Sequence, residues 1–161
     1  MIEPDNTLPN AIRVMFIDPA SEHVISQNRP FNPYEFYQKH AKRYQVKPYS
    51  TRMPMKACFD NAFEIAMTQN AKYIEGFVVS NGIAHPHAWN EIYGIAMDAT
   101  LEDPCTGEYY GVDIPLEAIQ RLYDYFKGDF SGVPANGIFT TMLYLPDKEL
   151  LEIKNLLDDN V

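Results

Sequence analysis

The middle of the chain has the apolar and polar pattern of consecutive β-strands. Residues 73–80 (YIEGFVVS), 87–93 (HAWNEIY) and 95–98 (IAMD) are rich in aromatic and aliphatic side chains and predict three strands. Asn81-Gly82 and Gly94 fit tight turns between them. Two further apolar segments, Ala11 to Asp18 and Ile138 to Leu145, each predict one more strand.

Apolar residues at helical spacing predict four helices. The first begins at residues 32–35 (NPYE), which combine an N-cap residue, a proline at the first helical position and an acidic residue three positions on. Its spacing continues through residues 36, 40 and 44 up to Pro48. After an irregular stretch over 48–57, a second helix is predicted from Cys58 to about Asn70, and amphipathic helices follow over 115–126 and 147–158.

The order of these elements indicates the fold class. A helix, several adjacent strands and then helix, strand and helix are typical of an α+β protein with a largely antiparallel sheet. A length of 161 residues fits one compact domain. We therefore expect a single domain over residues 1–161, in which the polar residues 1–10 form a loose arm and residues 131–137 form a loop.

Charge and hydropathy exclude several classes of protein. There are 22 acidic and 13 basic residues, a net charge of −9, which argues against a nucleic-acid partner. No apolar run approaches the 18 or more residues of a membrane span, and the N-terminus lacks the pattern of a signal peptide. The expected location is therefore the cytoplasm, and the oligomeric state is left open.

Basic residues are dense in only one part of the chain. This stretch has two interpretations: a solvated helix and loop, or a small patch for an anionic ligand or partner. It contains Lys39, Lys42, Arg43, Lys47, Arg52 and Lys56, interleaved with Tyr44 and Tyr49.

Cys58 lies where a proline-containing loop becomes a helix. The backbone N–H groups and the dipole at such a point stabilise a thiolate, and they face the position where a tetrahedral oxyanion would form. A thiolate nucleophile benefits from an imidazole and from a third polar group that orients it. His87 and Asp98, on successive predicted strands, could supply both. Each residue alone also has a non-catalytic interpretation. Cys58 could be a small buried residue, His87 a histidine whose hydrogen bonds are satisfied within the sheet, and Asp98 a residue that forms a turn.

The stretch YIEGFVVSNGIAHPHAWNEIYGIAMDAT resembles the core of the transglutaminase-like branch of the papain-like superfamily. In that family a Y-x-x-G strand leads to a His-Ala-Trp strand and then to Asp-x-Thr; here these motifs lie at residues 73–76, 87–89 and 98–100. CFDNAFEIA at 58–66 resembles the family's nucleophile helix, and GEYYGVDIP is similar to a segment of small bacterial and phage relatives. The resemblance covers about residues 56–115.

The resemblance implies a nucleophile helix packed on the sheet, with Cys58 as nucleophile, His87 as general base and Asp98 as the orienting acid. The implied protein is a thiol-dependent acyl-transfer enzyme without a cofactor. It would be a peptidase, amidase, deamidase or transamidase that acts on a protein or peptide amide, in the host cytoplasm if phage-encoded. The alternative is a non-catalytic binding or inhibitory protein of phage origin that retains the fold. That alternative is favoured by residues 44–57, where only Gln45 and no tryptophan could support an oxyanion.

Three further residues are candidates for substrate binding or shielding. Trp89 shares a strand face with His87, because alternate residues of a strand point the same way, and could cover the imidazole. His85 is expected to line the turn before that strand, and Asn61 follows Cys58 on the nucleophile helix.

Metal and redox chemistry are weaker interpretations. His85-Pro86-His87 together with Cys58 or Asp98 could ligate a metal, but no second paired motif supports a closed zinc site, so no metal is expected. Cys105 is expected to be an exposed loop residue, with a redox or resolving role as its alternative.

Overall fold

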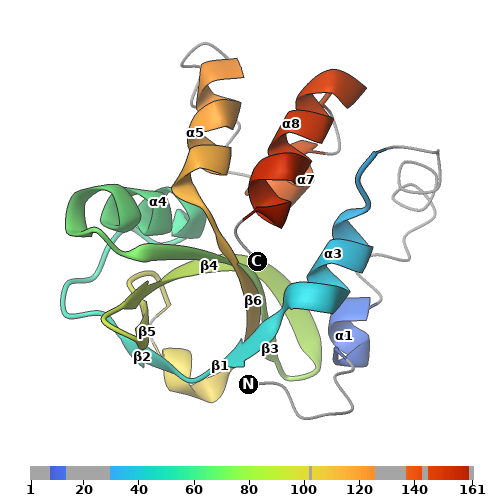
Figure 1. Ribbon diagram of the computed structural model, residues 1–161. Helices are drawn as coiled ribbons and strands as arrows, with labels where there is room; N and C mark the ends of the chain where they lie inside the picture. The colour runs from blue at the N-terminus through green and yellow to red at the C-terminus, as the bar shows by residue number, and fades with distance from the viewer. Residues whose placement is uncertain (1–7, 14–29, 102, 126–136, 143–144, 160–161) are drawn as a thin grey trace.

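A six-stranded curled sheet carries helices on one of its faces (Figure 1). The structure is a computed structural model and describes residues 8–13, 30–101, 103–125, 137–142 and 145–159. All neighbouring strands run antiparallel except β2 and β5, which are parallel, so the predicted α+β class with a largely antiparallel sheet is confirmed. The strands in spatial order are β1 (Lys42–Tyr44), β6 (Glu108–Ile114), β3 (Lys72–Ser80), β4 (Ile83–Ile92), β5 (Ile95–Asp98) and β2 (Val46–Pro48).

The two edge strands of this sheet are almost consecutive in the chain. Only Gln45 separates β1 from β2, yet β1 pairs with β6 at one edge and β2 pairs with β5 at the other. One extended segment can reach both edges only if the sheet curls until they approach each other. The curl encloses one face of the sheet and leaves the other face for the helices.

Two tight hairpins fix the register of the central strands. Asn81 and Gly82 have φ values of 52° and 75°, and Tyr93 and Gly94 have values of 50° and 79°. Two consecutive positive φ angles are the signature of a two-residue type I′ turn, whose twist matches that of the strands. The three predicted central strands are confirmed, although β4 begins four residues before the predicted start at residue 87.

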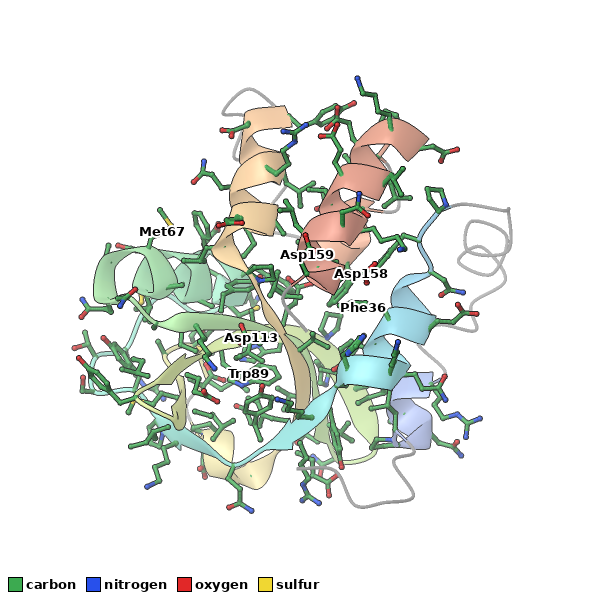
Figure 2. All side chains as sticks on the ribbon, in the orientation of Figure 1. Phe36, Met67, Trp89, Asp113, Asp158 and Asp159 are labelled. Atoms are coloured by element: carbon green, nitrogen blue, oxygen red, sulfur yellow. The ribbon has the colours of Figure 1, made fainter. Side chains whose placement is uncertain are left out.

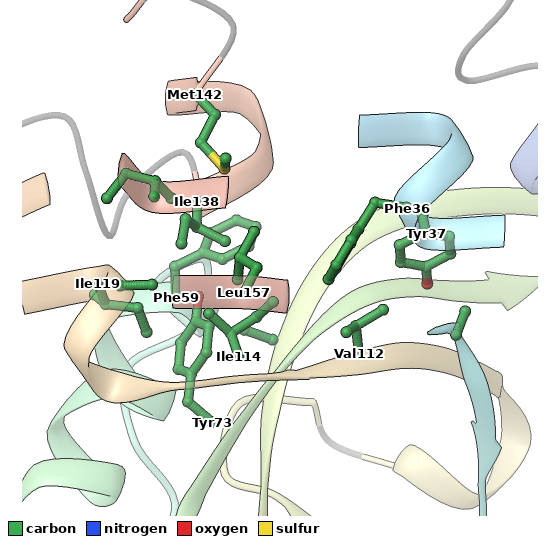
Figure 3. Close-up of a cluster of buried hydrophobic side chains, with 14 of the residues drawn as sticks. Phe36, Tyr37, Phe59, Tyr73, Val112, Ile114, Ile119, Ile138, Met142 and Leu157 are labelled. Atoms are coloured by element: carbon green, nitrogen blue, oxygen red, sulfur yellow. The ribbon is translucent and has the colours of Figure 1, made fainter. Parts of the chain in front are cut away.

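The helix-covered face of the sheet holds the larger hydrophobic cluster. Figure 3 shows Phe59, Ile138 and Leu157, from three different helices, meeting Tyr73 of β3 and Ile114 of β6. The helices that contribute are α1 (Asn10–Arg13), α3 (Pro33–His40), α4 (Cys58–Gln69), α5 (Leu116–Tyr125), α7 (Ile138–Met142) and α8 (Asp147–Asp158).

The enclosed face has its own, smaller cluster, and strands supply most of it. Its buried members are Val46, Ile74, Val78, Trp89, Ala96 and Tyr109. The alternation of side chains along each strand divides residues between these two clusters.

Three of the four predicted helices match the structure closely. α4, α5 and α8 differ from the predicted spans by at most one residue at each end. The first predicted helix begins as expected, with Asn32 Oδ1 accepting a hydrogen bond from the Glu35 amide at 3.2 Å. It ends at His40, not at Pro48, because residues 42–48 pair with β6 and β5 instead. Within the described residues, no helix is both long and apolar enough to cross a membrane.

The N-terminal strand prediction is wrong where it can be checked. Residues 10–13 form the short helix α1 (Asn10–Arg13), in which the Ile12 and Arg13 amides donate to the Pro9 carbonyl; residues 14–18 lie outside the described part. The loose arm expected over residues 1–10 is also wrong at its end, because Leu8 is buried in the core. Tertiary burial of Leu8 and Ile12 orders this segment.

The strand predicted over 138–145 is a helix over its first five residues. α7 begins after Gly137, whose φ is 77°, and both the amide and the hydroxyl of Thr141 donate to the Gly137 carbonyl. Residues 143–144 and most of the loop expected over 131–137 lie outside the described part. β6, which residue patterning did not single out as a strand, lies between β1 and β3.

Gly111 provides a test of the packing on the enclosed face. A Cβ atom at residue 111 would lie 2.6 Å from Trp89 Cη2 and 2.7 Å from Ile74 Cγ2, so Gly111→Ala overpacks this cluster. We expect a loss of about 1–3 kcal/mol in the free energy of unfolding, measured by urea denaturation, together with a shifted native emission of Trp89, the only tryptophan. Gly82→Ala is the control for the emission: its φ of 75° strains an alanine, so stability should fall there too, but its Cβ meets nothing within 4 Å and the native emission of Trp89 should not shift. Unchanged stability and emission in Gly111→Ala would contradict this packing.

Candidate active site

Cys58 is the first residue of α4 and is half-buried. The irregular segment before it is tied to the end of β5, the strand that carries Asp98. The Tyr49 amide donates to the Asp98 carbonyl, and the Met53 amide donates to the Ala99 carbonyl, both at 3.0 Å. The approach to the cysteine and the strand end with the carboxylate are therefore held as one unit.

The backbone just before Cys58 has an unusual conformation. Lys56 has a φ of 62°, in the left-handed region that costs a side-chain-bearing residue roughly 1 kcal/mol or more. The next residue, Ala57, is the N-cap of α4 and makes no side-chain capping bond. The first amides of α4 thus have no side-chain acceptor from their own cap residue.

His87 lies on β4, on the enclosed face of the sheet. Its side chain is 7% exposed, and its Nε2 atom is 2.6 Å from Asp98 Oδ2. Burial acts to lower the pKa of His87, but hydrogen bonds and charges from Asp98 and Cys58 outweigh it and raise this pKa to about 9. Since Nε2 is bound to the carboxylate, Nδ1 is left for the sulfur of Cys58. The structure therefore places His87 against Asp98, with Cys58 near enough to raise the pKa of His87.

Asp98 is a fully buried carboxylate that accepts four hydrogen bonds. Oδ1 accepts from the amides of Thr100 at 2.8 Å and Leu101 at 3.2 Å. Oδ2 accepts from His87 and from the Tyr109 hydroxyl, the latter at 2.7 Å. Burial acts to raise the pKa of Asp98, but these hydrogen bonds and the His87 charge lower it below its ordinary value. Asp98 is therefore a stable anion beside the imidazole.

Tyr109 is a site residue that the sequence did not reveal. It comes from β6, and its ring lies edge-on to His87, with centroids 6.0 Å apart and planes at 67°. Its segment, GEYYGVDIP, carried a family resemblance, but alternation alone does not tell which of the two adjacent tyrosines faces the site.

Trp89 covers one side of the imidazole. Its ring is nearly parallel to that of His87, with centroids 6.3 Å apart and planes at 21°, and it packs edge-on against Tyr109 and Tyr44. Trp89 is 1% exposed and lies among the strands in Figure 2. This placement fits the predicted shielding role, whereas a buried ring cannot offer a surface to substrate. Its indole N–H has no hydrogen-bond partner among the described residues.

The other two sequence candidates have different surroundings. Asn61 is buried, and its amide donates to the Pro54 carbonyl and the Thr100 hydroxyl, both at 2.8 Å. It braces the loop before Cys58 against the turn after Asp98; its role in substrate binding or shielding stays a prediction. His85 is exposed and shares the face of His87, two residues earlier on β4.

Two further predictions concern Cys105 and the absence of a metal site. Cys105 lies in a short 3-10 helix, Pro104–Thr106, but its side chain is outside the described part. Across the described residues, no group of three or more His, Cys, Asp or Glu side chains is placed to hold a metal ion.

Comparisons of this chain with protein-family models, curated proteins and solved structures gave no match. The functional argument therefore depends on the residues and their geometry.

A second buried carboxylate, Glu75, lies on the helix-covered face of β3. Its Oε1 accepts from the Tyr73 hydroxyl at 2.7 Å and the Ile138 amide at 2.8 Å, and its Oε2 accepts from the Phe139 amide at 3.1 Å. Burial raises the pKa of Glu75 to about 7, and these three hydrogen bonds only partly oppose the rise. Glu75 thus attaches the start of α7 to the sheet, close to Phe59 of α4.

This raised pKa has a consequence for stability. Folded Glu75 binds its proton more tightly than the unfolded chain does, so its contribution to stability is complete below about pH 4.5 and is lost as the pH rises through 7. Between pH 5.5 and 8.5 we expect the free energy of unfolding to fall by a Glu75 contribution of about 2 kcal/mol. Urea denaturation at both pH values measures it.

Glu75→Gln is the matched variant, because its side-chain amide keeps an oxygen acceptor and does not titrate. The His87 contribution changes in the same direction over this range and is common to both proteins. The difference between wild type and variant therefore isolates Glu75. Equal pH dependence in the two proteins would contradict the assignment.

Proposed function

We propose that this protein is a thiol-dependent acyl-transfer enzyme that acts on a protein or peptide amide through Cys58, His87 and Asp98. The observation that carries the proposal is the buried His87 imidazole, hydrogen-bonded to Asp98 through Nε2 and also to Cys58, with its pKa raised to about 9 by both partners. An imidazolium at neutral pH next to a cysteine favours the thiolate, the reactive form of the side chain.

The chemistry follows from this arrangement. The Cys58 sulfur attacks the amide carbonyl carbon, and the carbonyl oxygen becomes an oxyanion that the first amides of α4 can stabilise. His87 gives its proton to the amide nitrogen as the C–N bond breaks, which releases ammonia or an amine and leaves a thioester. Water then gives a proton to His87 and attacks the thioester, which yields a carboxylic acid and restores the thiolate beside the imidazolium.

Asp98 and Tyr109 keep the imidazole usable in both half-reactions. Asp98 holds the proton on Nε2, so Nδ1 alternates between accepting and donating on the side of the sulfur. The Tyr109 hydroxyl and the Thr100 and Leu101 amides hold the carboxylate itself in position. Tyr109 is therefore a positioning residue, which acts through Asp98.

We also propose that the core is of the transglutaminase-like type. Supporting observations are the helix that begins at the cysteine, the antiparallel strands that carry the histidine and the aspartate, and the chain order Cys, His, Asp. Such a core hydrolyses the amide or transfers its acyl group to an amine. Hydrolysis is the simpler outcome, because water is always present.

Thiol labelling tests the proposal without a known substrate. A free thiol has a pKa of about 8.5, so less than about 1% of it is ionised at pH 6. We expect substoichiometric iodoacetamide at pH 6 to label Cys58 in preference to Cys105, as mapped by mass spectrometry. His87→Ala removes the imidazolium and should slow labelling of Cys58 by up to about a hundredfold.

Melting curves recorded in parallel show whether the variants are folded. Preferential labelling of Cys105, or labelling of Cys58 that is unaffected by His87→Ala, would count against catalysis. Folded Cys58→Ala and His87→Ala proteins that keep the full biological effect of the parent would support the binding or inhibitory alternative.

A further inference from the structure

The charge of this chain is divided very unevenly. Residues 36–59 contain six basic residues and no acidic one, whereas the rest of the chain has seven basic residues against all 22 acidic ones. This stretch runs from α3 through β1 and β2 to Cys58. A strongly acidic protein thus concentrates its positive charge in the segment that leads to its nucleophile.

Part of this positive charge is compensated locally. Arg43 Nη2 lies 3.8 Å from Glu108 Oε1. The charge of Lys42 acts to lower the pKa of Asp113. The other four, Lys39, Lys47, Arg52 and Lys56, are exposed and make no ion pair with any residue that the structure describes. Lys39 lies on α3. We call the three that follow β1, namely Lys47, Arg52 and Lys56, the basic rim.

Each member of the basic rim is linked to the candidate site. Lys47 precedes Pro48, which pairs with Asp98 between β2 and β5. Arg52 Nη2 donates to the Leu101 carbonyl at 3.4 Å, and the amide of Leu101 donates to Asp98. Lys56 precedes Cys58 by two residues.

Lys56 provides a further, independent observation. Its φ of 62° is a conformation that glycine adopts without strain and that lysine adopts at a cost. The chain therefore holds a long cation in a strained conformation at the entrance to the nucleophile helix. The acidic residue closest to Lys56 in the sequence is Asp60, on α4. Among the described residues, Asp60 makes no ion pair with the basic rim.

We propose that the basic rim selects amides flanked by carboxylates, such as a glutamine side chain or a peptide bond within an acidic protein segment. This proposal rests on the proposed function. Three separate cations match a few carboxylates on a short segment. A nucleic acid matches less well, because a longer polyanion would extend onto the strongly acidic remainder of the surface.

A pair of thiol reagents measures the local potential at Cys58. Iodoacetate is an anion and iodoacetamide is neutral, so the ratio of their alkylation rates reports the charge around the sulfur. We expect this ratio to be higher at Cys58 than for 2-mercaptoethanol. It should fall about twofold in each of Lys47→Gln and Lys56→Gln, as expected for one charge some 8 Å away in water.

Lys148→Gln is the matched control: Lys148 is exposed on α8 and makes no ion pair with a described residue, so the ratio should equal that of the parent. If Cys58 reacts with iodoacetamide and the ratio is the same in all variants, the basic rim is overturned and the proposed function stands. If Cys58 does not react with iodoacetamide at pH 6, both are overturned.

Competition with a peptide tests the chemical class of the substrate. A peptide of glutamates around one glutamine should slow the labelling of Cys58 by iodoacetamide, and Lys56→Gln should weaken this protection. The same peptide with lysines in place of the glutamates should not protect. Equal protection by both peptides, or stronger protection by an RNA oligonucleotide of equal charge, would overturn the proposal.

Discussion

The buried carboxylate of Asp98 is the group around which the sheet and the site are built. A buried charge is strongly destabilising unless hydrogen bonds and an opposite charge compensate it. Its four donors come from β4, from β6 and from the turn after β5. In a flat sheet β6 and β5, three strands apart in the order, would be about 14 Å apart. The curl instead brings the Tyr109 hydroxyl within 2.7 Å of Asp98, so the curvature and the charge depend on each other.

The two faces of the sheet treat their buried carboxylates differently. Asp98 faces an imidazole that can become a cation, and its pKa is lowered. Glu75 faces the neutral amides of α7 and the Tyr73 hydroxyl, and its pKa is raised to about 7. A buried carboxylate is thus a stable anion at the candidate site, whereas the other buried carboxylate, which joins the sheet to α7, changes its protonation near neutral pH. Trp89 packs nearly parallel to the His87 ring and Tyr109 packs edge-on to it, so aromatic side chains border the buried imidazole.

Local chemistry made much of the fold predictable. The Asn81-Gly82 and Tyr93-Gly94 turns and the Asn32 cap depend on residues that are adjacent in the sequence. The elements that were wrong or missed depend on partners far along the chain. Residues 42–48 have helical spacing but pair with strands 50 to 70 residues away, and residues 138–142 look strand-like but begin a helix on Glu75.

The candidate site divides in the same way. Cys58, His87 and Asp98 could be selected from motif spacing, because each lies in a recognisable local pattern. Tyr109 and the bracing role of Asn61 could not, since both depend on contacts across the curled sheet or between two loops. A left-handed Lys56 also leaves no signal in the sequence, because glycine or asparagine is the residue expected in that conformation.

The central claim is that His87 is held as a cation by Asp98 on one side and by Cys58 on the other. The most direct measurement is the titration of the His87 ring nitrogens by NMR in ¹⁵N-histidine-labelled protein. The account predicts a pKa of about 9 in the parent and a lower pKa in Cys58→Ser, where the neutral hydroxyl cannot balance the imidazolium. A His87 pKa near the ordinary 6.5 that is unchanged by Cys58→Ser would contradict the account.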